Sequence, residues 1–276
     1  HETRLVSFEE PAVYPDLMQG RLAISENDAL AADNVRYFTV AVGRPARVAV
    51  VAPQDDKSAS REIARLVSEA LAPRGLRSRG QAAVEPATVP ASQLGGRSLG
   101  QFEAVFLADV PEVPPAAWAA LEQFVAEGGG LVVILGPAAG AELSAEGSSY
   151  RSAPARSLLG VEPAAPRHIP AGARFENVAY DDPALAAFDH GANGDLTQPV
   201  IYRYVPLSPQ AGAKAVLGLP GGAALVRRPY KAGSVFVLAT APQRQWSNLA
   251  GQAEFVILVH SLLGAARRQF DQASPY

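Results

Sequence analysis

The stretch ALEQFVAEGGGLVVILGP, residues 120–137, decides the fold class of this chain. Its first part, 120–127, carries apolar side chains at helical spacing and predicts an amphipathic helix. The three glycines at 128–130 are typical of a helix end followed by a tight turn. The apolar run at 131–135 has no alternation, which indicates a strand buried on both faces of a parallel sheet. The stretch therefore predicts a helix, a glycine turn, a buried strand and then an elbow.

The elbow after this strand carries no nucleophile. Pro137, Ala138 and Ala139 occupy it, and these residue types have no ionisable or nucleophilic atom. The whole chain lacks cysteine, which excludes disulfides, thiolate metal sites and cysteine nucleophiles. Covalent catalysis cannot begin at this elbow. The sequence therefore indicates an architecture and argues against the chemistry that such an elbow usually performs.

The same pattern extends towards the N-terminus. RVAVVAP (47–53) and AVFLA (104–108) are apolar runs without alternation, as expected of parallel strands covered on both faces. Amphipathic helices are expected over 58–71 and after Pro114-Pro115. Strand, helix, strand, helix and strand with short turns predict a doubly wound α/β sheet with helices on both faces.

Beyond the elbow, residues 138–199 do not continue the alternation of predicted strands and helices, and they are rich in Ala, Gly, Pro and Ser. We expect an irregular excursion that hides small elements, since a structureless loop of that length is unusual. Order returns with strands at 213–217, 223–227 and 234–239, joined as antiparallel hairpins. A helix over 252–268 is expected to close the domain, which spans 44–276.

Residues 1–43 differ from the rest of the chain. Short runs of β-branched and aromatic residues alternate with turn residues, and no helical period is visible. We expect a β segment here, either a hairpin or part of a β-sandwich.

Composition excludes several classes of protein. The chain has 276 residues and a net charge of −3, with no long basic run, which argues against a nucleic-acid surface. No apolar run reaches the roughly 18 residues of a membrane span. His1 is not a natural start, so we expect a piece of a longer protein with its targeting or anchoring segments outside it.

Polar residues after the predicted parallel strands are the candidate ligand-binding groups, because open α/β sheets bind ligands beyond those strand ends. They are Asp55 after the first strand, Asp109 after the second, and Arg244 and Trp246 after the last. Carboxylates near an arginine can bind a polar ligand or a divalent ion. The alternative for Asp55 is a solvated charge at a helix start. We assign no metal site and no cofactor, since no histidine pair has i,i+4 spacing.

His190 is the candidate for acid–base chemistry. It lies in DHGANGD (189–195), where Asp189 or Asp195 can orient an imidazole. A hydrolase also needs a placed nucleophile, and none of the nearby serines sits in a Gly-x-Ser-x-Gly elbow (Ser144, Ser148 and Ser149). We therefore assign no catalytic residue and keep His190 with an aspartate as an alternative.

Three stretches carry a family resemblance: DALAADNVRYFTVAV (28–42) leading into 47–53, the stretch 120–137, and most of 181–263. Together they resemble the glutamine-amidotransferase-like region of bacterial aerotolerance-regulator-type membrane proteins, which also carry a von Willebrand A-type domain. The resemblance implies a flavodoxin-like or class I glutamine amidotransferase-like sheet, preceded by the end of an immunoglobulin-like domain. It also implies a membrane-anchored bacterial parent. Amidotransferases carry a cysteine on the elbow that is missing here, so the resemblance supplies no catalytic residue.

The expected function is a non-catalytic interaction or sensing domain of a membrane-anchored bacterial protein, placed outside the cytoplasm. Its expected partners are other membrane or envelope proteins and no nucleic acid, with the membrane reached through segments outside this sequence. Two alternatives stay open at this point. One is a domain that binds a small polar ligand or a carbohydrate, and the other is a hydrolase that uses His190 with an aspartate.

Overall fold

The computed structural model describes residues 16–24, 34–42, 44–53, 58–96, 98–191 and 193–267. The chain divides into two compact units, His1–Pro45 and Ala46–Tyr276. In the first unit, β1 (Asp16–Ala23) and β2 (Val35–Val42) form an antiparallel hairpin that pairs Ala23 with Val35. The derivation of this unit from an immunoglobulin-like domain stays a prediction.

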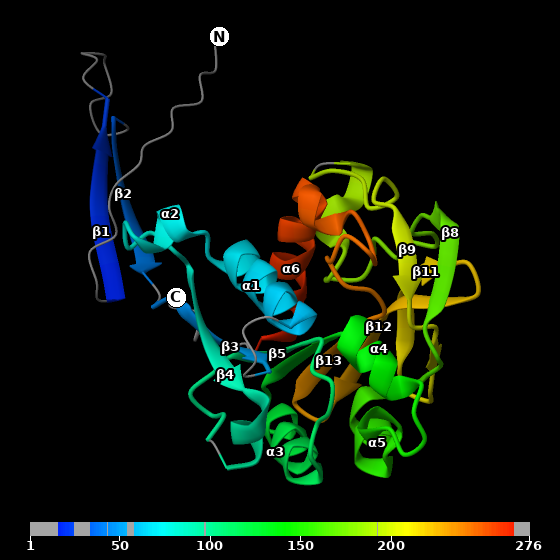
Figure 1. Ribbon diagram of the computed structural model, residues 1–276. Coiled ribbons are helices and arrows are strands. Elements are labelled where there is room, and N and C mark those ends of the chain that lie inside the picture. Colours follow the sequence, from blue (N-terminus) through cyan, green and yellow to red (C-terminus); the bar gives the residue numbers. More distant parts are fainter. Residues whose placement is uncertain are drawn as a thin grey trace. The chain divides into compact units, whose positions relative to one another are not determined.

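The second unit is built on a nine-stranded sheet whose core is parallel (Figure 1). Five strands lie side by side in the order β4-β3-β5-β6-β13, and all four pairings between them are parallel. Their bounds are β3 Ala46–Ala52, β4 Val84–Pro90, β5 Ala104–Ala108, β6 Gly130–Ile134 and β13 Gly233–Leu238. Numbered along the chain, the order is 2-1-3-4-5, which is that of flavodoxin-like sheets. The expected α/β fold class is confirmed.

Antiparallel strands extend the sheet beyond β13. β12 (Gly222–Tyr230) pairs with β13, β10 (Leu207–Pro209) and β11 (Lys214–Leu219), and β7 (Val161–Pro163) pairs with β10. Two further strands, β8 (Arg167–Ala173) and β9 (Ile201–Tyr204), form a separate antiparallel pair. The excursion after the elbow therefore supplies β7 of the large sheet and β8 of the small one.

Helices cover both faces of the parallel core. Figure 1 shows α1 (Ala59–Leu71) and α6 (Ala253–Ala266) on one face, and α3 (Pro115–Ala126) and α5 (Ala153–Leu159) on the other. Every residue of β5 and β6 is buried, which explains why these strands lack the alternation of a half-exposed strand. Burying this apolar surface between two helical layers is the main force that holds the sheet together.

Local sequence signals set the helix boundaries. α1 starts after Ser58, whose side chain accepts a hydrogen bond from the Arg61 amide as an N-cap. α3 starts after Pro114, with Pro115 in its first turn, where the missing amide hydrogen costs nothing. The short helices α2 (Arg74–Arg77) and α4 (Pro137–Leu143) follow α1 and the elbow. α4 matters most for the site, because it begins at the carboxyl end of β6.

Candidate functional site

The elbow after β6 is closed by a buried carboxylate. Asp109, at the end of β5, accepts hydrogen bonds from the amides of Gly136 at 3.0 Å, Ala138 at 3.1 Å and Ala139 at 2.9 Å. Ser60 of α1 donates its hydroxyl to the same carboxylate at 3.0 Å. These amides form the first turn of α4, where a bound anion or a developing oxyanion would otherwise find its donors. Asp109 therefore occupies that position from within the fold.

The geometry around Asp109 is tight. Its side chain is fully buried and its backbone has a φ of +52°, a conformation that aspartate tolerates better than most residues. A Cβ atom on Gly136 would lie 2.8 Å from the Asp109 Cγ, so the elbow needs glycine there. Burial raises the pKa of Asp109 to about 6, while the hydrogen bonds that it accepts act in the opposite direction. Asp109 thus ties β5, α1 and α4 together at the carboxyl edge of the sheet.

A small hollow of about 280 Å³ lies against α4. We call it the α4 hollow. Its residues come from α4, from the β8–β9 pair and from the loop after β13, and they are Pro137, Gly140, Ala141, Ser144, Pro166, Arg167, His168, Arg203, Gln245 and Trp246. The volume lies just below the range of roughly 300–1,000 Å³ that is typical of small-molecule sites, so only a small ligand fits.

Gly140 brings the walls of the hollow together. A Cβ atom at this position would lie 2.8 Å from Pro166 Cγ and 3.1 Å from Trp246 Cη2. The Trp246 side chain is only 3% exposed, so it supports the hollow and offers little free aromatic face. The tight packing of α4 against Pro166 and Trp246 holds the wall in a fixed place.

The charge of the hollow is positive. Arg167, His168 and Arg203 are exposed, and the part of the chain that the structure describes contributes no acidic residue to the lining. His168 lies opposite Arg203 in the β8–β9 register, so the two positions are adjacent. None of the three side chains has an ion-pair partner within the described ranges. Guanidinium groups bind carboxylates and phosphates through paired N–H donors, so this arrangement suits an anion.

The candidates predicted after the strands do not meet in one place. Trp246 lines the α4 hollow, whereas Arg244 is exposed on the same loop and is not among the lining residues. Asp109 reaches the other side of α4, where its oxygens already accept four hydrogen bonds. Asp55 lies outside the described residues. A direct role of these four residues in ligand binding stays a prediction.

The acid–base candidates lie in one exposed loop. The His190 side chain is 94% exposed and its Nε2 lies 3.5 Å from Oδ2 of Asp189. The Asp195 carboxylate accepts hydrogen bonds from Thr197 and Gln198. These bonds, with that from Gln198 the largest cause, lower the pKa of Asp195. His190 does not line the α4 hollow. Its use in a hydrolase stays a prediction.

Sequence reasoning missed the cationic residues of the hollow. Arg167 and His168 belong to β8, and Arg203 belongs to β9, two strands that pair across more than thirty residues of chain. Pro166 directly before β8 and Pro170 within it hide the strand from pattern analysis. The available signal was the pair of cations at 167–168 in an otherwise uncharged stretch. Over the residues described by the structure, no three His, Asp or Glu side chains gather as a metal site.

Comparison with solved structures finds the same fold in distant proteins. Two cytoplasmic proteins from Salmonella typhimurium, STM3548 and STM1381, match 92% of this chain and 97% of their own, with TM-scores of 0.59 and 0.54 and identities of 16% and 15%. A ThuA-like protein from Bacteroides uniformis matches over 80% of this chain and 91% of its own, with a TM-score of 0.55 and 12% identity. No protein-family model and no curated protein matches the chain. At these identities the likeness establishes the fold alone.

These comparisons correct the family expectation. The similar structures are not aerotolerance-regulator or von Willebrand A-type proteins, and no family model supports that assignment. The quoted stretches misled because apolar strands, glycine turns and amphipathic helices recur in doubly wound sheets of many families.

The expected placement as a membrane-anchored, extracytoplasmic domain is also wrong. Both Salmonella structures are described as cytoplasmic proteins, which points away from that placement. The described helices include none that is long and apolar enough to cross a bilayer.

Proposed function

We propose that this chain is a non-catalytic sensing domain that binds a small anionic ligand in the α4 hollow. One observation carries the proposal: Arg167, His168 and Arg203 line a hollow whose described residues include no acidic side chain. The guanidinium groups of Arg167 and Arg203 therefore have no counter-charge among these residues, and a bound carboxylate or phosphate supplies one. The exposure of these side chains leaves their donors accessible to a ligand.

The residues around the hollow favour ligand binding and argue against catalysis. The elbow beside it holds Pro137 and Ala138, and its amides are committed to Asp109. Ser144 lines the hollow, but its hydroxyl donates to the Gly140 carbonyl at 3.0 Å, as serines inside helices often do. The hydroxyl is therefore not held by a general base, as a serine nucleophile needs to be.

The proposal is tested by thermal unfolding with citrate and with inorganic phosphate, each compared with sodium chloride at the same ionic strength. Binding to the folded state raises the melting temperature as ligand concentration passes the dissociation constant. We expect a rise with at least one of the two anions in the wild type. Arg203→Ala is expected to remove most of that rise, because it deletes one of the two guanidinium groups that line the hollow.

Arg79→Ala is the matched control, since Arg79 is exposed, donates a hydrogen bond to Gln81 and does not line the hollow. It should respond to anions as the wild type does. A melting temperature that follows ionic strength alone, or an equal loss in both variants, contradicts the proposal. A rise with glucose that exceeds the rise with either anion would favour the carbohydrate alternative instead.

A further inference from the structure

A second cationic surface lies along α1 and shares no lining residue with the α4 hollow. We infer that it binds an acidic peptide segment in extended conformation. The surface is a groove of about 670 Å³, and we call it the arginine groove. Its charged lining consists of Arg61, Arg65, Arg74 and Arg77 with Glu62 and Glu69. Among the described residues of the lining, positive side chains outnumber negative ones by two.

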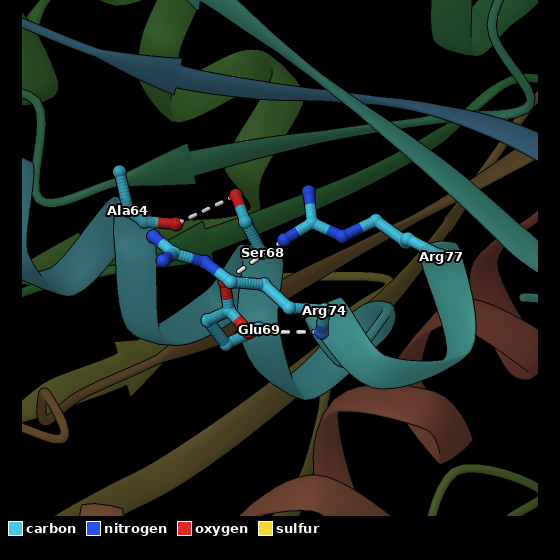
Figure 2. A network of polar contacts seen from close by, with 5 residues as sticks. All are labelled: Ala64, Ser68, Glu69, Arg74 and Arg77. Atoms are coloured by element: carbon cyan, nitrogen blue, oxygen red, sulfur yellow. Dashed lines mark hydrogen bonds and ion pairs between the residues drawn. The ribbon is translucent and has the colours of Figure 1, made fainter. Parts of the chain in front are cut away.

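Glu69 fixes one end of the groove. Its Oε1 accepts a hydrogen bond from Arg77 Nη2 at 2.8 Å and another from Arg74 Nε at 3.1 Å. Its Oε2 accepts the backbone amide of Arg74 at 3.2 Å. Figure 2 shows both arginines reaching Glu69 from α2, beside the Ser68 hydroxyl that donates to the Ala64 carbonyl. One carboxylate thus orders two guanidinium groups and leaves their combined charge positive.

The middle of the groove carries a cation without an internal partner. Arg65 is exposed, and within the described part of the chain no carboxylate lies within ion-pair distance of it. Arg61 lies one helical turn earlier on the same side of α1, and its Nη1 donates to the Pro53 carbonyl at 3.3 Å. An acidic ligand along this side of the helix can pair with Arg65.

The dimensions of the groove decide between a peptide and a small anion. Its lining runs along the whole of α1, which has 13 residues and is therefore about 20 Å long. An extended peptide advances about 3.3 Å per residue, so roughly six residues span that length. A small anion contacts only one end. An acidic hexapeptide can reach Arg65 and the Arg74–Arg77 end at the same time.

The experiment is fluorescence anisotropy with a labelled hexaglutamate peptide, compared with labelled hexaglutamine. We expect saturable binding of hexaglutamate only, weakening with salt. Arg65→Glu should weaken binding by about tenfold, because it changes the local charge by two units at an exposed position. Glu62→Gln should strengthen it by roughly threefold, since it removes a negative charge from the lining. Both side chains are exposed on α1, so neither belongs to its buried face.

Two controls separate this site from general charge and from the α4 hollow. Arg79→Glu makes the same charge change outside the groove lining, and Arg203→Ala alters only the hollow. Both should bind hexaglutamate like the wild type apart from a general charge effect of less than about twofold for Arg79→Glu. Three results would overturn the inference. Hexaglutamate binding could be weakened equally by Arg65→Glu and Arg79→Glu, it could be lost only in Arg203→Ala, or equimolar citrate could displace the peptide completely. Because the proposed function depends on Arg203 and this site on Arg65, either can fail while the other stands.

Discussion

The two sides of α4 differ in how their polar groups find partners. At its first turn, three amides share the carboxylate of Asp109, which is fully buried. On its outer side, Arg167, His168 and Arg203 line a hollow whose described residues include no acidic side chain. The amides of the first arrangement have their acceptor within the fold, whereas the arginines of the second have no ion-pair partner among the described residues. The polar groups at the elbow are therefore structural, whereas the groups available to a ligand lie on another face of α4.

Loss of the buried carboxylate is expected to have the largest effect. Asp109→Ala leaves three backbone amides and the Ser60 hydroxyl without their acceptor, and each unsatisfied buried group costs about 1–3 kcal/mol. We expect the free energy of unfolding to fall by at least about 3 kcal/mol, measured by urea denaturation. Asp181→Ala is the control, since Asp181 is exposed and pairs only with exposed Lys214. A loss below about 1 kcal/mol for Asp109→Ala would contradict a structural role.

The pH dependence of stability gives the next largest effect. The pKa of Asp109 is about 6 in the folded protein and 3.8 as its ordinary value. Between these values the folded state keeps a proton that the unfolded state has lost, so stability falls as pH rises from about 4 to about 6 and levels off above. The difference amounts to at most about 3 kcal/mol. Denaturation of the wild type and of Asp109→Asn across this range tests it, because the variant lacks this slope. Parallel curves for the two proteins would show that Asp109 does not titrate there.

A smaller effect is expected from filling the space at Gly140. In Gly140→Ala the new Cβ meets Pro166 and Trp246 at distances that force a shift. Overpacking of this kind costs about 1–3 kcal/mol, and better helix propensity returns up to about 1 kcal/mol. We expect a net loss of about 1 kcal/mol and weaker anion binding, because the wall of the hollow moves. Gly264→Ala in α6 makes the same change where nothing lies within 4 Å, and it should stabilise the protein or leave it unchanged. Equal changes in stability and anion binding for Gly140→Ala and Gly264→Ala would contradict a packing role of Gly140.

The outer side of α4 should contribute least to stability. Arg203 is exposed and its guanidinium has no ion-pair partner among the described residues, so Arg203→Ala should change the free energy of unfolding by less than about 0.5 kcal/mol without ligand. Urea denaturation in ligand-free buffer measures this. A larger loss would place Arg203 among the residues that hold the fold, together with Asp109.

Sequence alone predicted the parallel core well, because β3, β5 and β6 are unbroken apolar runs whose burial is visible in the pattern. β4 escaped notice because its sequence, VEPATVP, holds two prolines and few apolar residues, as suits the edge of a sheet. Without β4 the strand order could not be completed.

The site was less predictable than the fold. Asp109 was placed correctly at a strand end, but its burial and its four donors depend on how α1 and α4 pack, which no local pattern encodes. Trp246 was singled out and does line the hollow. Arg167, His168 and Arg203 come together only when β8 pairs with β9, and this pairing is a long-range event.

Anion binding beside Trp246 is tested most directly by NMR. The indole N–H signals of the ¹⁵N-labelled protein are followed during a citrate titration at constant ionic strength. The chain has two tryptophans, which makes the measurement internally controlled. Trp246 lines the hollow, whereas Trp118 lies in the core against Tyr150 with ring centroids 5.6 Å apart. We predict that the Trp246 signal moves saturably and the Trp118 signal stays in place. A Trp246 signal that does not move, or two signals that drift together without saturation, would contradict the account.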